Sequence, residues 1–274
     1  MALAGALVLA ACSGGLSQRS TAEMADKVPV GQGIRCVRIE LENGTIGIAN
    51  GTDRAADYAG GVRRAADTAA DLAKIEQVAF RLEVRPDAAR PDTLILAGPR
   101  MPEGVVGLLS LELGLRLPPE IELEVAITGS GHITVGERKA RVLASTGRGD
   151  LRFEACRGPV KADTGRGTVI AFDHAGDLDI LTKVGDMTAF VREPASLIRL
   201  VSGQGTVQCG VPEGTGFDLD ARAETGFVGA GFGLAAERVG EFGSALVARQ
   251  GSGATRVVLR TGSGHLAFKP KKFD

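Results

Sequence analysis

The chain has 274 residues and a formal net charge of −1, with 32 Lys and Arg residues against 33 Asp and Glu residues. This length suffices for one large or two small domains with a hydrophobic core, and the balanced charge excludes the basic footprint of a nucleic-acid-binding protein. Glycine is abundant, at 39 residues, whereas the chain has one Tyr and no Trp.

The first residues predict an export signal. An apolar run over 2–11 ends in small residues before Cys12. This run is too short to span a bilayer but suits the apolar region of a secretory signal. The sequence "LAAC" at 9–12 resembles a lipobox, the bacterial signal in which the cysteine is acylated and becomes the new N-terminus. The alternative is an alanine-rich start with an ordinary cysteine.

If the lipobox interpretation holds, residues 1–11 are a signal peptide, Cys12 carries the lipid, and 12–33 form a polar tether. Ser13 rather than Asp follows the cysteine, which resembles outer-membrane sorting in a Gram-negative cell. We therefore expect a lipid-anchored protein of the cell envelope, in the outer membrane if the host is Gram-negative.

Residues 34–128 predict a small strand-rich region. The segment 34–51, "IRCVRIELENGTIGIANG", alternates apolar and polar residues about an Asn-Gly turn, which indicates two short strands. The segment 53–75 is rich in alanine, and the spacing of Val62, Leu72 and Ile75 fits one face of a helix. This segment is therefore either a helix or a loose insertion.

Three more stretches before the end of this region have the character of strands. Two of them cover 77–84 and 93–96, on either side of a turn that contains two prolines. The third, 108–131, contains Pro118-Pro119, which predicts a strand, a corner and another strand.

A repeat begins at the end of this region. The first glycine of each Gly-x-Gly pair serves as a register mark, and the first three intervals between marks are 18 residues. Later intervals are 20, 23 and 36 residues, the last being twice the basic period. The marks are Gly129, Gly147, Gly165, Lys183 in a variant copy, Gly203, Gly226 and Gly262.

The columns around the mark predict how each copy folds. A hydroxyl residue precedes every mark, and apolar residues follow four and six positions later. A glycine follows two positions after each mark except Gly226, where Val228 stands. Apolar residues two apart lie on one face of a strand, and glycine supplies the positive φ angle of a tight corner. Each copy therefore predicts two short strands and two corners, and we expect the hydroxyl residues to stack in a ladder.

One copy cannot bury its apolar edge alone, whereas stacked copies share a continuous core. The sequence thus predicts an all-β protein with a right-handed parallel β-solenoid over 129–269. A short tail follows over 270–274. We expect Lys269-Pro270-Lys271-Lys272 to cap the open edge of the last copy, because charge and proline discourage further strand pairing.

Arg148-Gly149-Asp150 matches the tripeptide read by integrin-type receptors. All three residues, however, occupy regular columns of the repeat. The column of Asp150 also holds His132, Thr168, Asp186 and His265, which are polar as an outward strand position requires. We interpret the tripeptide as a consequence of register and not as a receptor motif.

The densest polar cluster contains Asp173, His174, Asp177 and Asp179. Carboxylates near a histidine can bind a metal or transfer protons. Gly176 marks a corner, however, and the aspartates alternate with apolar residues, so we expect a solvated surface loop. His132 and His265 lie near opposite ends of the repeat, too far apart to share a ligand.

The columns also exclude other ligand sites. A calcium-binding β-roll needs aspartate two residues after the second glycine, where this chain has Leu151, Val169 and Met187. The Gly-x-Gly pairs stand between strands, and no phosphate loop opens a helix. We therefore expect no catalytic residue, no metal and no cofactor.

Three cysteines follow Cys12, namely Cys36, Cys156 and Cys209. An odd number is not a disulfide framework. One disulfide bridge among them and three unpaired thiols are equally open alternatives. Cys209 occupies an apolar column, which predicts a buried small side chain.

The order of these segments resembles a bacterial adhesin-like family whose members have a head domain of parallel β-coils. The resemblance rests on "ENGTIGI" at 42–48, "LRLPPEIELEVAITGSGHITV" at 115–135, and the glycine repeat down to "RTGSGHLAF" at 260–268. It covers most of 34–268, implies the coil fold, and lends no catalytic residue.

We therefore expect a non-enzymatic, lipid-anchored envelope protein that acts as an adhesin-like surface binding or scaffold module. Its partners would be the membrane, through the lipid, and an envelope protein or a glycan. One alternative is a polysaccharide-active β-helix enzyme, against which stand the few aromatic residues. The other is an envelope sensor or assembly accessory.

Overall fold

The structure is a computed structural model that describes residues 17–79 and 81–273. It divides into two compact units, one up to His132 and the other from Ile133 onward. The described residues form twenty β-strands and one α-helix. This composition confirms the all-β class.

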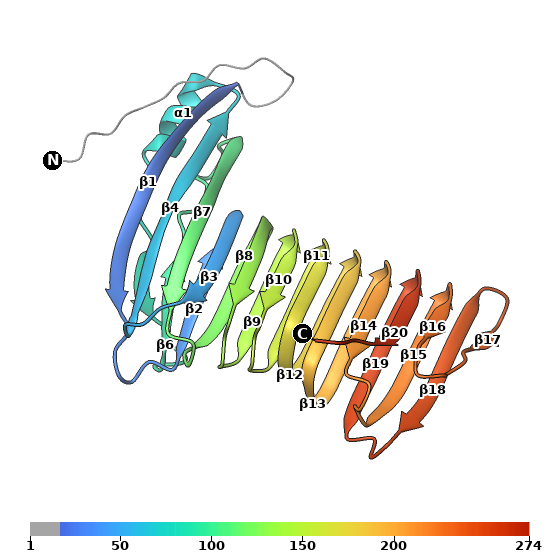
Figure 1. The fold of residues 1–274 in the computed structure, drawn as a ribbon. Coiled ribbons are helices and arrows are strands. Elements are labelled where there is room, and N and C mark those ends of the chain that lie inside the picture. The colour runs from blue at the N-terminus through green and yellow to red at the C-terminus, as the bar shows by residue number, and fades with distance from the viewer. Residues whose placement is uncertain (1–16, 80, 274) are drawn as a thin grey trace. The chain divides into compact units, whose positions relative to one another are not determined.

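The first unit (unit 1) contains two rows of paired strands (Figure 1). In one row, β2, β6 and the first half of β8 pair in parallel, and β5 is added antiparallel to β6. In the other row, β1, β4 and β7 are antiparallel, and β3 is parallel to β7. The elements are β1 (Gln18–Pro29), β2 (Cys36–Leu41), β3 (Gly44–Asn50), β4 (Ala55–Ala66), α1 (Ala69–Glu76), β5 (Glu83–Pro86), β6 (Thr93–Ala97), β7 (Gly107–Leu117) and β8 (Glu122–Gly136), the last of which crosses into unit 2.

Two segments of unit 1 differ from the sequence-based expectation. The segment expected as a polar tether contains β1, which pairs with β4 from Gln18 opposite Ala66 to Pro29 opposite Ala55. The alanine-rich segment expected as a helix or loose insertion contains the strand β4 and the helix α1. The helical spacing of Val62, Leu72 and Ile75 did not predict β4. This strand lies between β1 and β7, and its main chain is paired on both sides.

The helix α1 occupies the C-terminal part of the alanine-rich segment, after β4. It begins at Thr68, whose hydroxyl accepts a hydrogen bond from the main-chain N–H of Asp71. Ile75 is its buried residue. A strand expected over 77–84 is displaced toward the C-terminus, because α1 extends to Glu76 and β5 begins only at Glu83.

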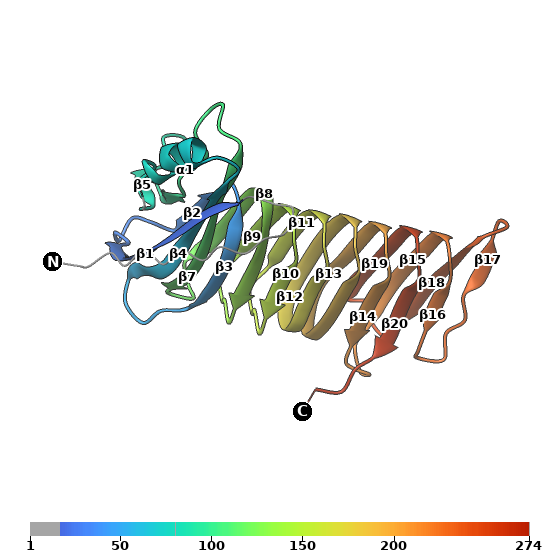
Figure 2. The ribbon, with the colours of Figure 1, turned by 90° about the horizontal axis from the view of Figure 1, so that it is seen from above.

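The second unit (unit 2) continues with strands that follow one another in two rows (Figures 1 and 2). One row pairs β9, β11, the second halves of β12 and β13, then β19, β15, β18 and β17. The other row pairs the end of β8 with β10, the first halves of β12 and β13, then β14, β20 and β16. The strands are β9 (Val142–Arg148), β10 (Leu151–Glu154), β11 (Val160–Arg166), β12 (Val169–Val184), β13 (Met187–Gln204), β14 (Val207–Val211), β15 (Phe217–Thr225), β16 (Val228–Ala230), β17 (Glu237–Val239), β18 (Gly243–Gln250), β19 (Thr255–Ser263) and β20 (Leu266–Pro270).

The first copies of the repeat pair in parallel at a displacement of one period. Leu151 lies between Ile133 and Val169, and Phe153 lies between Val135 and Ala171. All six side chains are fully buried. The apolar columns recognised in the sequence therefore form a continuous core in which each copy completes the burial of its neighbours.

The corner glycines hold successive copies close together. Gly185 has a φ of +150°, and a Cβ atom there would lie 1.9 Å from the carbonyl oxygen of Gly167. Gly205 stands in the same relation to Gly185, at 2.1 Å. Both the backbone conformation and the available space therefore restrict this column to glycine.

The hydroxyl column serves the same corners. Thr164 donates a hydrogen bond to the carbonyl oxygen of Gly149, and Ser202 donates to that of Gly185, at 3.1 and 3.0 Å. Each hydroxyl thus bonds a corner glycine of the preceding copy. Thr146 differs, because it donates to the carbonyl oxygen of Arg148 in its own copy. Bonds from the hydroxyl column to the preceding copy are thus made at Thr164 and Ser202 but not at every position.

The last copies do not stack in chain order. The strand β19 lies between β13 and β15, with Ser263 paired to Gln204 on one side and to Thr225 on the other. Likewise, β20 lies between β14 and β16. The C-terminal segment therefore fills a place between two earlier segments, and the expected cap at 269–272 is wrong because β20 is paired on both sides. In the row that contains β19, the strand β15 pairs with β19 on one side and with β18, antiparallel, on the other.

This arrangement also corrects the register of one copy. Val228 pairs with Leu266, and Gly226 lies against Gly264, the second glycine of its pair. Gly226 is therefore also a second glycine and not the register mark. The interval of 36 residues that ends at Gly262 is thus not two periods.

Replacing Gly185 by alanine is predicted to lower the free energy of unfolding by about 2–3 kcal/mol, because the added Cβ meets a carbonyl oxygen and the φ is unfavourable. Urea denaturation followed by circular dichroism measures this loss. The matched control is Gly214→Ala, since nothing lies within 4 Å of a Cβ at Gly214. Equal stability of the two variants would contradict the close approach at the corner.

The inserted C-terminal segment predicts a cross-linking pattern. Gln204→Cys with Ser263→Cys should form a disulfide under mild oxidation, because these residues are paired neighbours and adjacent strands lie about 4.8 Å apart. Gln204→Cys with Thr225→Cys should not, because β19 separates them. Non-reducing peptide mapping distinguishes the pairs, and stacking in chain order would give the reverse result.

Candidate functional site

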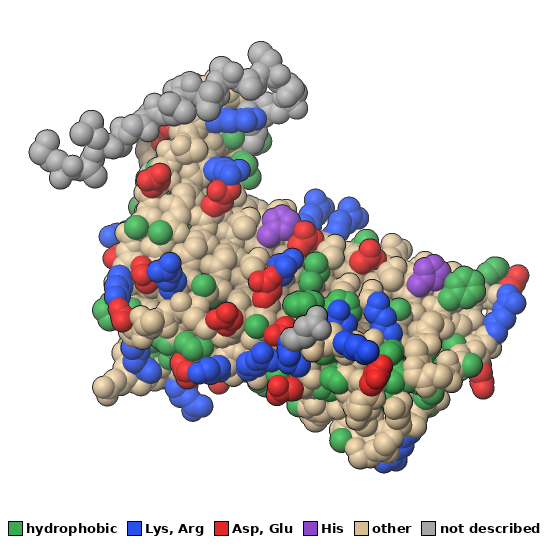
Figure 3. Space-filling model, in the orientation of Figure 1, with side chains coloured by type: hydrophobic (Ala, Val, Ile, Leu, Met, Phe, Trp, Pro, Cys, Tyr) green, Lys and Arg blue, Asp and Glu red, His purple; other side chains and the backbone are tan. Residues whose placement is uncertain are grey.

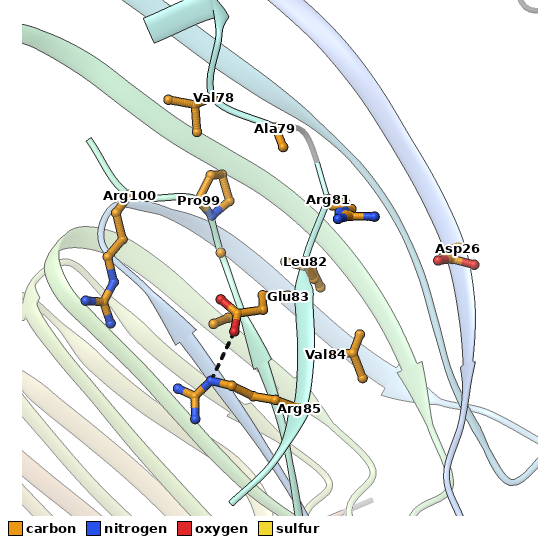
Figure 4. Close-up of a pocket in the computed structure, with 12 residues that line it drawn as sticks. Asp26, Val78, Ala79, Arg81, Leu82, Glu83, Val84, Arg85, Pro99 and Arg100 are labelled. Atoms are coloured by element: carbon orange, nitrogen blue, oxygen red, sulfur yellow. Dashed lines mark ion pairs between the residues drawn. The ribbon is translucent and has the colours of Figure 1, made fainter. Parts of the chain in front are cut away.

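A groove of unit 1 has a volume of 790 Å³ and lies beside two edge strands (Figure 4). Among the described strands, β5 pairs only with β6, and β1 pairs only with β4. Residues of β5 and the segment before it form one wall, Asp26 of β1 contributes to another, and Ala97 to Arg100 complete the groove. The lining side chains that Figure 4 labels are Asp26, Val78, Ala79, Arg81, Leu82, Glu83, Val84, Arg85, Pro99 and Arg100.

The groove is lined by charged and apolar side chains together. Nε of Arg85 lies 3.5 Å from Oε1 of Glu83, the pair drawn as a dashed line in Figure 4, and its Nη2 lies 3.4 Å from Oε2 of Glu40. Within the described part of the chain, neither Arg81 nor Arg100 forms an ion pair. Two guanidinium groups are therefore available to a ligand that carries hydrogen-bond acceptors.

A second groove of 530 Å³ adjoins the first and shares Ala97, Gly98 and Arg100 with it. Its other walls come from β2 and β8, with Glu40 and Glu42 among the lining residues. Oε2 of Glu42 accepts a hydrogen bond from the main-chain N–H of Met101. The two grooves together form a surface lined by both acidic and basic side chains. Sequence reasoning missed this surface, because it depends on which strands lie at an edge.

The tripeptide Arg148-Gly149-Asp150 lies at a corner of unit 2. Oδ1 of Asp150 accepts a hydrogen bond of 2.8 Å from the main-chain N–H of Thr168 in the next copy. Asp186 bonds Thr206 in the same way, at 2.7 Å. The carboxylate therefore holds neighbouring copies together, which supports the interpretation of the tripeptide as part of the repeat.

The polar cluster at 173–179 is not the surface loop that the sequence predicted. It lies within β12, and the His174 side chain is fully buried. Each aspartate bonds a neighbouring copy. Asp173 pairs with Arg157 and Arg192, Asp177 accepts the main-chain N–H groups of Ser196 and Leu197, and Asp179 pairs with Arg199.

His174 belongs to an interior column that sequence reasoning did not detect. Arg138, Cys156 and His174 follow one another at intervals of 18 residues and are all fully buried. Nε2 of His174 lies 3.1 Å from the carbonyl oxygen of Asp177, and the Cys156 thiol donates to the carbonyl oxygen of Val135. Burial lowers the pKa of His174 and raises that of Cys156. The constant spacing was the signal that could have revealed this column.

The three cysteines within the described residues are free and buried. Burial raises the pKa of the Cys36 thiol to about 11 and that of Cys209 to about 12. Unpaired thiols are thus the correct one of the two alternatives. These groups are shut off from solvent and protonated at neutral pH.

The remaining predicted positions are His132, His265 and Cys12. His132 and His265 are exposed, as expected for an outward column. Cys12, the expected lipid attachment residue, lies outside the described residues. No group of three or more His, Cys, Asp or Glu side chains suited to a metal ion occurs within 17–79 and 81–273. In the same ranges, no helix is long and apolar enough to cross a membrane.

Comparison with known proteins identifies a distant structural likeness. No protein-family model matches the chain, and no curated protein is similar to it. A crystal structure of a candidate cell adhesion protein from Clostridium sporogenes aligns with 92% of this chain and 100% of that chain, at 13% identity and a TM-score of 0.39. These values are too low to transfer a function to this chain.

The burial of His174 predicts a specific pH dependence. Its pKa is lowered in the folded protein, so below about pH 6.5 the unfolded chain takes up a proton that the folded chain does not. The free energy of unfolding should therefore fall, relative to His174→Val, by up to about 1.4 kcal/mol per pH unit as the pH drops below that value. Urea denaturation between pH 5 and 8 measures the difference. His132→Val, at an exposed position, is the control, and parallel pH profiles for wild type and His174→Val would contradict the prediction.

Proposed function

We propose that this protein is a non-enzymatic, lipid-anchored module of the cell envelope that binds an extended ligand along the grooves of unit 1. The observation that carries the proposal is the groove beside the edge strands β5 and β1, with the unpaired guanidinium groups of Arg81 and Arg100 in its walls. An adhesin-like surface role is consistent with this arrangement. The ligand would be an envelope protein or a glycan.

The position of β1 makes the anchor short. If Cys12 carries the lipid, only residues 13–17 separate it from β1, which starts at Gln18. Five extended residues span at most about 18 Å. Unit 1 and its grooves would therefore stay close to the membrane surface, and the polar tether expected over 12–33 would be shortened to these few residues.

Unit 2 would act as the scaffold of this module. We propose that its parallel copies form a right-handed β-solenoid, the hand being that of nearly all parallel crossovers. The support for this proposal is the one-period register of the first copies and the filled apolar core. The buried groups that could perform chemistry, such as His174 and Cys156, bond to the main chain and are inaccessible to a substrate.

The anchor is tested on the native protein and a Cys12→Ala variant. The native protein should have the mass of a chain that starts at an acylated Cys12, and it should partition into the detergent phase of a Triton X-114 extraction. The variant should keep its signal peptide and stay in the aqueous phase. An unmodified, soluble native protein would rule out the anchor.

The groove is tested by charge reversal. Arg81→Glu with Arg100→Glu should reduce co-sedimentation of the purified protein with isolated envelopes of the source cells by at least about tenfold, because two ligand contacts are lost and like charges are added. Arg148→Glu with Arg166→Glu is the matched control, since both of these arginines are exposed in unit 2. Equal loss in both double variants would mean that nonspecific charge, and not the groove, holds the protein.

A further inference from the structure

A separate pocket lies in unit 2 over β16, β17 and β18. It has a volume of 570 Å³, within the range of ligand sites. We call it the end pocket, and define it by Thr225–Val228 and Ala236–Arg238 with Glu241–Ser244. Hydrophobic side chains gather on the surface of this region (Figure 3). Exposed apolar surface of this kind marks interaction sites.

Phe227 forms a fixed wall of the end pocket. Its side chain is 74% exposed, yet its ring stacks on His265 with centroids 5.5 Å apart and planes 13° from parallel. Nδ1 of the same histidine accepts the main-chain N–H of Phe227 at 3.2 Å. One face of the ring is therefore held by the histidine, which leaves the opposite face for a ligand and limits the entropy lost on binding.

Other lining residues add a second ring and a set of hydrogen-bond acceptors. Phe242 is 66% exposed, and its main-chain carbonyl accepts the N–H of Gly226, which ties it to the corner beside Phe227. Glu237 and Glu241 make no ion pair within the described residues, and the guanidinium of Arg238 donates to the carbonyl oxygen of Glu241. Free carboxylates accept hydrogen bonds and cannot donate them.

We propose that the end pocket binds sugar rings that carry no negative charge. The face of an aromatic ring is electron-rich, so it packs well against the C–H face of a sugar, while the hydroxyl groups of the sugar donate to the carboxylates. The lining carries the two carboxylates of Glu237 and Glu241 against the one guanidinium of Arg238, so its net negative charge disfavours a polyanion. A purely apolar partner would bury these carboxylates without hydrogen bonds, at a large desolvation cost. This inference stands apart from the grooves of unit 1.

Saturation-transfer NMR on the full chain tests the proposal with three probes, namely cellotetraose, the tetrasaccharide of N-acetylglucosamine, and tetragalacturonate. We expect signals from one or both of the first two sugars and none from the acidic one. Phe227→Ala should weaken binding about tenfold or more, because it removes the ring that contacts the sugar. Phe227→Tyr should retain binding, since the ring remains.

The matched control is Phe172→Ala, which removes an exposed phenylalanine that does not line the end pocket. Circular dichroism confirms that each variant is folded. The proposal is overturned if neither uncharged sugar gives a signal, if tetragalacturonate binds as well as they do, or if both alanine variants lose binding equally. It is also overturned if analytical ultracentrifugation shows a dimer that Phe227→Ala dissociates, because the exposed rings would then be an interface between copies.

Discussion

The close approach of successive main chains at the glycine corners is the constraint on which the rest of unit 2 depends. A Cβ at Gly185 or Gly205 would lie about 2 Å from the carbonyl oxygen of the preceding corner glycine, so only hydrogen fits there. The same approach brings each strand into hydrogen-bonding distance of the next and each apolar pair into contact with its neighbours. Thr164 and Ser202 of the hydroxyl column then donate to the carbonyl oxygens of corner glycines.

This constraint explains why side chains that resemble functional groups are structural. Asp150, Asp177 and His265 each accept main-chain N–H groups from the neighbouring copy in the stack. Such bonds satisfy polar groups that the close packing would otherwise leave without partners. The binding surfaces that we propose lie instead where regular pairing stops. In unit 1 this is beside the edge strands β5 and β1, and in unit 2 it is beside the short strands β16 and β17.

The sequence predicted the period, the apolar columns and the role of the tripeptide. It did so because each copy repeats a glycine corner followed by alternating apolar residues. The order of the last copies did not follow, since β19 satisfies the same columns whether it stacks last or between β13 and β15. β1 was missed because its side chains are mostly exposed and only its main chain is paired. His174 was misplaced because a turn signal nearby outweighed its spacing of 18 residues from Cys156. The groove of unit 1 and the end pocket depend on which strands are left without a neighbour on one side. A local sequence pattern does not predict this.

The central claim is that each 18-residue copy is a unit that stacks in register on the next. Its most direct test is the deletion of residues 151–168, which joins Asp150 to Val169 and restores every column one copy earlier. We predict a folded protein with a cooperative denaturation curve and an unchanged β-type circular dichroism spectrum, whereas deletion of 151–159 should prevent folding because it puts the columns out of register. Equal disruption by the two deletions would contradict the claim.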